Sequence, residues 1–219
     1  MKEFFKAYKF YMKMVYPPLM LVLTFLVMSV GIIIIIVTDL PETKKSFFST
    51  LNECSMFHIG IMFNCIYTEL LKQFKFFKTT KFAKVYYTVI PVFAMAVIGV
   101  IYDIILFFAA AVFMDFNFAS DLIIYNSVAT IATVLLGSAS NIPKLSTFAW
   151  LFWATYCLFF PLFHWAMPQM TTFGLPIYAD ILIAIAIYAM GFTVNVALLN
   201  HWWTKTERNV CKSAVWQIQ

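Results

Sequence analysis

The residue types that most often carry out catalysis are few in this chain and lie far apart. Its three histidines are His58, His164 and His201. A zinc protease needs H-E-x-x-H on one helix, a serine hydrolase needs a G-x-S-x-G turn, and a nucleotide site needs a G-x-x-x-x-G-K-[ST] loop. None of these motifs occurs in the sequence. We therefore predict no catalytic residue, no metal site and no cofactor site on this chain.

The remaining candidates for chemistry are polar residues inside long apolar stretches. Asp103 lies about midway through one such stretch, and His58 and Asn64 lie in another. A charge at the centre of a bilayer is costly, so an acid there is a functional candidate by default. Two interpretations of Asp103 stay open. It lies near the outer end of a short span, where it is wet or neutralised, or it faces the bundle interior and pairs with a polar group.

The composition predicts the elements that hold these residues. The chain has 219 residues, of which 63% are hydrophobic and 11% are charged, against about 45–50% and about 25% in soluble domains. A spanning helix needs about 20 apolar residues, and six stretches qualify: 16–38, 51–71, 85–113, 122–140, 148–167 and 176–203. We predict an all-α, polytopic membrane protein with about six transmembrane helices in a single transmembrane domain, 1–219. Pro91 predicts a kink in the third span.

The distribution of lysine and arginine predicts the topology. With six spans and a cytoplasmic N-terminus, thirteen of the fifteen basic residues lie on the inside, and only Lys44 and Lys45 lie in an outside loop. This asymmetry follows the positive-inside rule. It places both termini, including a tail at 204–219, in the cytoplasm, and we expect the chain in a bacterial plasma membrane. Trp202 and Trp203 end the sixth span, where a membrane interface belongs.

The N-terminal arm, 1–15, has the pattern of an interfacial helix. Four lysines form a narrow helical stripe: Lys2, Lys6, Lys9 and Lys13. Aromatic and apolar residues, among them Phe4 and Tyr8, lie on the opposite side. Such a helix lies in the headgroup plane with its aromatic side chains in lipid and its ammonium groups near anionic phosphates. The alternative is an ordinary basic flank that only fixes topology.

The loop between the second and third spans is basic and aromatic. Its central residues are Lys75, Phe76, Phe77, Lys78, Lys81 and Lys84. One interpretation is that the lysines fix topology and hold anionic lipid. The other is that the loop docks a cytoplasmic partner, because exposed aromatic residues are unusual unless lipid or protein covers them. The net charge of +5 is explained by topology, so we predict no nucleic-acid partner.

The order of these elements resembles the permease subunits of ABC-2-type ABC transporters. The segment from Glu69 to Tyr87, ELLKQFKFFKTTKFAKVYY, is similar to that family's cytoplasmic turn, although Thr79 and Thr80 stand where the family often has proline with a small residue. The resemblance implies a separate cytoplasmic ATP-binding subunit, a second permease copy or homologue, and contact between the ATPase and this turn. It also implies export of an amphipathic substrate, a peptide or a lipid-like molecule.

Two other functions stay open from the sequence. One is a six-helix substrate-binding subunit of a small-molecule importer, which would carry an A-x-x-x-A face on the first span; the first span lacks it. The other is a membrane scaffold or immunity protein that transports nothing.

Overall fold

The computed structural model describes residues 83–140 and 173–216 continuously, with the backbone alone beyond 203, and scattered positions among 4–63, 145 and 151. Four helices lie in the continuous parts: α5 (Ala83–Thr88), α6 (Ile90–Phe113), α7 (Phe116–Ser140) and α9 (Ile177–Trp216). The elements in the described residues are all helices, which confirms the all-α part of the predicted fold class; the six spans and the N-terminal interfacial helix are not confirmed.

The interruption between α5 and α6 coincides with a proline. Pro91 lies in the first turn of α6 and has no N–H with which to bond the carbonyl of Tyr87, four residues earlier. Hydrogen bonds from Val89 N to Val85 O and from Phe93 N to Val89 O, each 2.9 Å, span the break. Lys84–Phe113 therefore forms one 30-residue helical span, in which the regular helix is interrupted at Val89.

A tight turn joins α6 to α7. Asp115 Oδ1 accepts a hydrogen bond of 2.8 Å from Phe118 N, which is the geometry of an N-cap that satisfies an otherwise unpaired amide. Because of this cap, α7 begins at Phe116, six residues before the predicted start at 122. Asp121, which the sequence placed in a loop, consequently lies within α7 and is buried.

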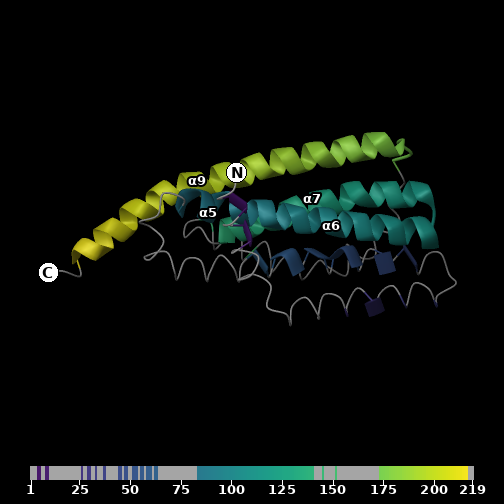
Figure 1. Ribbon diagram of the computed structural model, residues 1–219, viewed down its shortest axis with the longest axis horizontal. Helices are drawn as coiled ribbons and strands as arrows, with labels where there is room; N and C mark the ends of the chain where they lie inside the picture. Colours follow the sequence, from purple (N-terminus) through teal and green to yellow (C-terminus); the bar gives the residue numbers. More distant parts are fainter. Residues whose placement is uncertain are drawn as a thin grey trace.

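The helices pack with α7 in the middle. α6 and α7 form an antiparallel hairpin, and α9 runs along α7 (Figure 1). α9 has 40 residues, a length of about 60 Å at 1.5 Å per residue. It extends beyond the end of the hairpin (Figure 1). Because α9 ends at Trp216, the segment predicted only as a tail is largely helical.

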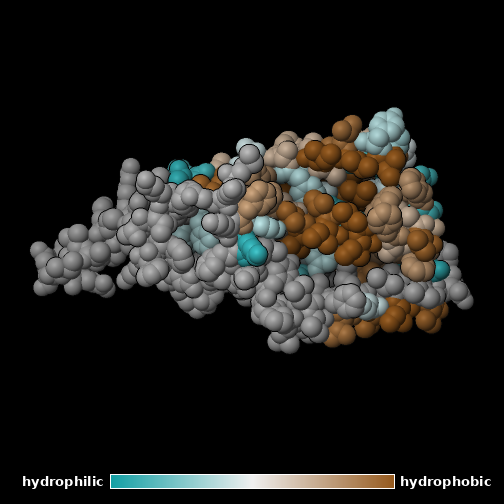
Figure 2. Space-filling view, viewed as in Figure 1, coloured by the Kyte–Doolittle hydropathy of each residue, from teal (hydrophilic) through white to brown (hydrophobic). Residues whose placement is uncertain are grey.

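Among the described residues, three helices are long and apolar enough to cross a membrane: Lys84–Phe113, Phe116–Ala139 and Ile177–Trp203. Their outward side chains include Ile104 and Phe108 on α6 and Leu182 and Ile185 on α9, all exposed. Figure 2 shows apolar residues, in brown, gathered over the right-hand half of the face in view. Water would disfavour so large an apolar surface. The arrangement indicates a membrane-embedded protein.

A second exposed stripe lies on the first predicted span. Leu26, Val30, Ile33 and Val37 are helical, are spaced by four, three and four residues, and are 53–75% exposed. Residues at this spacing share one face of a helix. The stripe is therefore the outward face of that segment.

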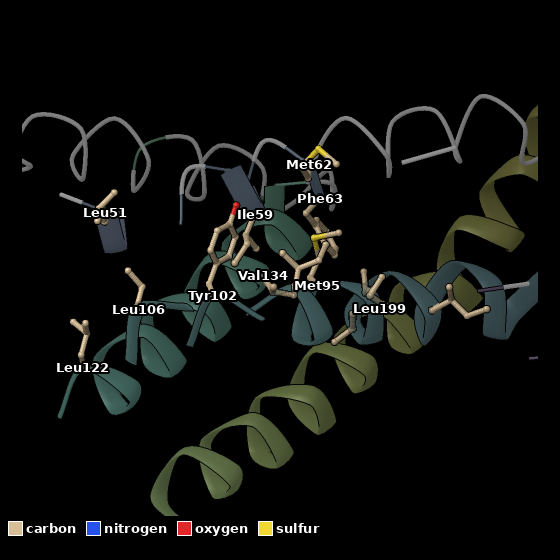
Figure 3. Packing of buried hydrophobic residues seen from close by; sticks show 14 of the residues in the cluster. Leu51, Ile59, Met62, Phe63, Met95, Tyr102, Leu106, Leu122, Val134 and Leu199 are labelled. Carbon is tan, nitrogen blue, oxygen red and sulfur yellow. The ribbon is translucent and has the colours of Figure 1, made fainter. Parts of the chain in front are cut away.

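The core lies between the hairpin and the second predicted span. Ile59, Met62 and Phe63 pack toward Met95 and Val134 in a buried apolar cluster (Figure 3). Dense packing of this kind fixes the rotation of each helix, because voids forfeit dispersion contacts. It therefore determines which polar side chains point inward.

Two N-terminal aromatic residues, Phe4 and Tyr8, pack on α6. Phe4 and Tyr8 each place their ring 5.5 Å from the ring of Phe93 on α6, in edge-to-face geometry. Lys9 and Phe5 are exposed. The sequence pattern predicts Phe4 and Tyr8 on the lipid side of the arm and does not reveal their contact with Phe93; both side chains are half-buried, and their position in lipid stays a prediction.

Candidate functional site

A buried carboxylate lies at the centre of the candidate site. Asp103 on α6 is only 6% exposed. Asn126 Nδ2 donates to its Oδ1 at 2.5 Å, and the Tyr188 hydroxyl donates to its Oδ2 at 2.7 Å. Ser127 Oγ lies 3.3 Å from Oδ2. α6, α7 and α9 thus each contribute at least one residue.

These residues lie at one depth. Asp103 is ten residues from the Phe113 end of α6, Asn126 is ten from the Phe116 end of α7, and Tyr188 is eleven from the Ile177 end of α9. At 1.5 Å per residue, each is about 15 Å from that end. The hydrocarbon core of a bilayer is about 30 Å thick. The carboxylate therefore lies about half the thickness of a hydrocarbon core from this end of the bundle.

The hydrogen bonds extend to the second predicted span. Ser55 Oγ lies 3.0 Å from Asn126 Oδ1 and 2.6 Å from the carbonyl of Asn52. Asn126 Nδ2 also lies 3.4 Å from the carbonyl of Gly99. Asn126 and Ser55 are almost fully buried. A continuous polar network thus joins four helical segments inside an apolar bundle.

Gly99 makes room for this network. A Cβ atom at this position would lie 2.5 Å from Thr130 Cγ2, 2.7 Å from Tyr188 Oη and 3.0 Å from Thr130 Oγ1. Thr130 and the tyrosine hydroxyl therefore approach the α6 backbone at a point that only glycine leaves open. Small residues commonly permit such close crossings in membrane bundles.

A second polar pair lies beside the first. His58 Nδ1 and the Tyr102 hydroxyl are 2.5 Å apart, and the two rings meet edge to face at 5.9 Å. Tyr102 precedes Asp103 in α6. The pair connects the second predicted span to α6 close to the depth of the carboxylate.

Two acidic side chains, Asp121 and Asp180, lie near the N-terminal ends of α7 and α9. Asp121 Oδ2 accepts a 3.1 Å hydrogen bond from Phe173 N, and Tyr125 stacks on the Phe173 ring at 5.5 Å. Asp180 is fully buried and neither of its oxygens makes a hydrogen bond. Within the described part of the chain, no three acids, histidines or cysteines are grouped as metal ligands.

The structure brings some predicted site residues together. Asp103 lies in the bundle interior rather than at a wet end, and His58 lies near it, paired to Tyr102. Lys84 and Lys9 are exposed, and Trp203 stacks on Tyr87 with 5.2 Å between ring centres. Trp202 is half-buried. The other predicted residues lie outside the described residues: Asn64, Lys2, Lys6, Lys13, Lys75, Phe76, Phe77, Lys78 and Lys81.

The partners of Asp103 were missed by sequence reasoning. Ser127 and Thr130 were visible as small, hydroxyl-bearing residues at helical spacing, a pattern that ordinary packing also explains. Asn126 and Tyr188 carry no comparable signal. The distinguishing signal is depth, since all three helices place a polar residue the same distance from one end.

No family model, curated protein or solved structure matches this chain. The function is therefore inferred from the residues and their geometry.

Proposed function

We propose that this chain is the membrane permease subunit of an ABC-2-type exporter, driven by a separate cytoplasmic ATPase. In this proposal the chain has six spans, an N-terminal interfacial helix, and both termini in the cytoplasm of the cell that carries it in its plasma membrane. A second permease copy or homologue completes the transporter. The substrate is an amphipathic peptide or a lipid-like molecule.

The observation that carries the proposal is how the basic and aromatic turn joins the bundle. The turn leads directly into α5, whose second and third residues, Lys84 and Val85, are exposed. Tyr87 on the same short helix is fully buried, and its ring stacks on Trp203 of α9. A force applied to the turn therefore reaches two elements, α6 through the Val89 junction and α9 through the stacked rings.

The composition of the chain supports a division of labour between subunits. The sequence contains no phosphate-binding G-x-x-x-x-G-K-[ST] loop, so ATP would bind on a partner chain. The described helices instead present exposed apolar side chains outward and a polar network inward. A membrane subunit that moves a substrate while its partner hydrolyses ATP needs these two surfaces and no catalytic residue.

Affinity purification in mild detergent tests the proposal. The tagged chain, expressed from its native locus, should recover an ATP-binding subunit, identified by mass spectrometry. Charge reversal at Lys75 and Lys78 should abolish that recovery while membrane insertion is retained. The matched control reverses Lys44 and Lys45, the pair predicted on the outer side, and should leave recovery unchanged.

Two results would count against this function. Failure of the unmodified chain to recover any nucleotide-binding protein would reject the ABC assignment. Equal recovery by the Lys75/Lys78 variant and the Lys44/Lys45 control would reject the turn as the docking site.

A further inference from the structure

The surroundings of Asp103 offer hydrogen-bond acceptors as well as donors. The single hydroxyl hydrogen of Ser127 has two candidate acceptors: Ile123 O at 2.7 Å and Asp103 Oδ2 at 3.3 Å. Because Ile123 O is the closer acceptor and the hydroxyl rotates, Ser127 Oγ is able to donate to the ionised carboxylate or to accept from the protonated acid. Thr130 Oγ1 is buried beside the Tyr188 hydroxyl and makes no hydrogen bond of good geometry. It is a second acceptor.

Both favourable and unfavourable interactions act on an ionised carboxylate at this position. Asn126 and Tyr188 both donate to it, and hydrogen bonds to a charged group are stronger than neutral ones. Against this, its partners among the described residues are all neutral, and a carboxylate inside a membrane span without a counter-charge is costly. The site therefore accommodates both the ionised and the protonated carboxyl group.

The protonated form fits the same helix positions. Asp103 Oδ1 continues to accept from Asn126, while the new Oδ2–H donates to Tyr188 Oη. The tyrosine hydrogen then turns from Oδ2 to Thr130 Oγ1, which gains the partner that it lacks. One O–H bond forms on Oδ2, one hydroxyl rotates, and no helix moves.

We infer that Asp103 is a proton-binding site in the interior of the helical bundle, with Tyr188 and Thr130 as the side chains that adjust when the proton binds or leaves. The ligand is a single proton on Oδ2. The inference goes beyond the proposed function and does not depend on an ATPase partner, since it concerns the contacts of this chain alone.

Other groups near the site titrate and must be separated from Asp103. The side chains that α7 directs at the carboxyl group are neutral, and α9 contributes only Tyr188. The second predicted span contributes two titratable groups. One is the His58 imidazole, which pairs with Tyr102, and the other is Glu53, which is buried two residues before Ser55. His58→Gln therefore serves as a control for histidine titration, and Glu53→Gln for a second carboxyl group.

Infrared spectroscopy of the protein in lipid nanodiscs, recorded as a function of pH, tests the inference. The wild type should show a protonated-carboxyl C=O stretching band that disappears reversibly as the pH rises. Asp103→Asn should remove that component, and this variant keeps the shape and one donor of the protonated acid, so it should fold. His58→Gln, Glu53→Gln and Asp121→Asn should retain the component.

Two further variants predict shifts of opposite sign. Tyr188→Phe removes the donor to the ionised form and the acceptor of the protonated form. The bond to the charged form is the stronger of the two, so the midpoint of the band should move up by about 1 pH unit. Thr130→Val removes an acceptor of the protonated form, so the midpoint should move down by up to about 1 pH unit. A band unaffected by pH, a band retained by Asp103→Asn, or shifts of one sign in both variants would overturn the inference.

Discussion

Replacement of Gly99 by alanine probes the closest approach in the bundle. The added Cβ would lie 2.5 Å from Thr130 Cγ2 and 2.7 Å from Tyr188 Oη, well inside van der Waals contact. Neither neighbour can yield freely, because Thr130 is fully buried and the tyrosine hydroxyl is hydrogen-bonded to Asp103 at 2.7 Å. The added methyl group should therefore separate α7 and α9 from α6.

The sign of the effect separates packing from helix propensity. In an open helix, glycine to alanine stabilises by up to about 1 kcal/mol. Overpacking a tight core costs about 1–3 kcal/mol. Because the two contacts at Gly99 are so short, we expect a net loss of about 1–2 kcal/mol. At about 2–4 °C per kcal/mol for a chain of this size, the Tm should fall by about 2–8 °C.

Thermal unfolding in detergent, followed by size-exclusion chromatography of the protein that remains folded, measures this loss. The control is a double-variant cycle with Thr130→Ser, which removes only the methyl group at 2.5 Å. The combination of Gly99→Ala with Thr130→Ser should recover at least half of the lost Tm, because the two changes affect one contact. A Tm that is unchanged or raised in Gly99→Ala would refute the close crossing of these three helices.

Two further predictions concern the contacts that attach peripheral elements to the bundle. Trp203→Ala should lower the free energy of unfolding by about 1–3 kcal/mol, because it removes the ring stacked on Tyr87; Trp202→Ala is the matched control, and equal losses in both variants would argue against a special role for the stack. Phe93→Ala should speed tryptic cleavage after Lys9, because Phe4 and Tyr8 lose the ring on which they pack. Phe5→Ala, at a position 62% exposed, should leave that cleavage rate near the wild-type value, and an equal rate in both variants would contradict the docking of the arm on α6.

The sequence predicts the all-helical class and the apolar helices well, because hydropathy is summed over about 20 residues and tolerates local errors. It predicts boundaries poorly where one hydrogen bond decides them. The start of α7 depends on Asp115 accepting from Phe118 N, and hydropathy gives no weight to such a cap. The six-span topology and the interfacial helix remain predictions.

The site illustrates a different limit of sequence reasoning. Asp103 could be selected from its position in an apolar stretch, but its partners lie 23, 24 and 85 residues away in the chain. Their contact depends on the rotation and depth of α6, α7 and α9, which the packing of the whole core sets. Asn126 and Tyr188 are unremarkable in the sequence for this reason.

The two proposals meet on α9. This helix is continuous from Tyr188, which contacts the Asp103 carboxyl group, to Trp203, which stacks on the helix that follows the basic turn. The two side chains are fifteen residues apart, about 22 Å along one helix. Because a continuous helix moves largely as a unit, a displacement of its Trp203 end relative to α6 changes the distance between Tyr188 Oη and Asp103. Binding of an ATPase at the turn and binding of a proton at Asp103 would then be linked through one element, and each would alter the equilibrium of the other by the same free energy.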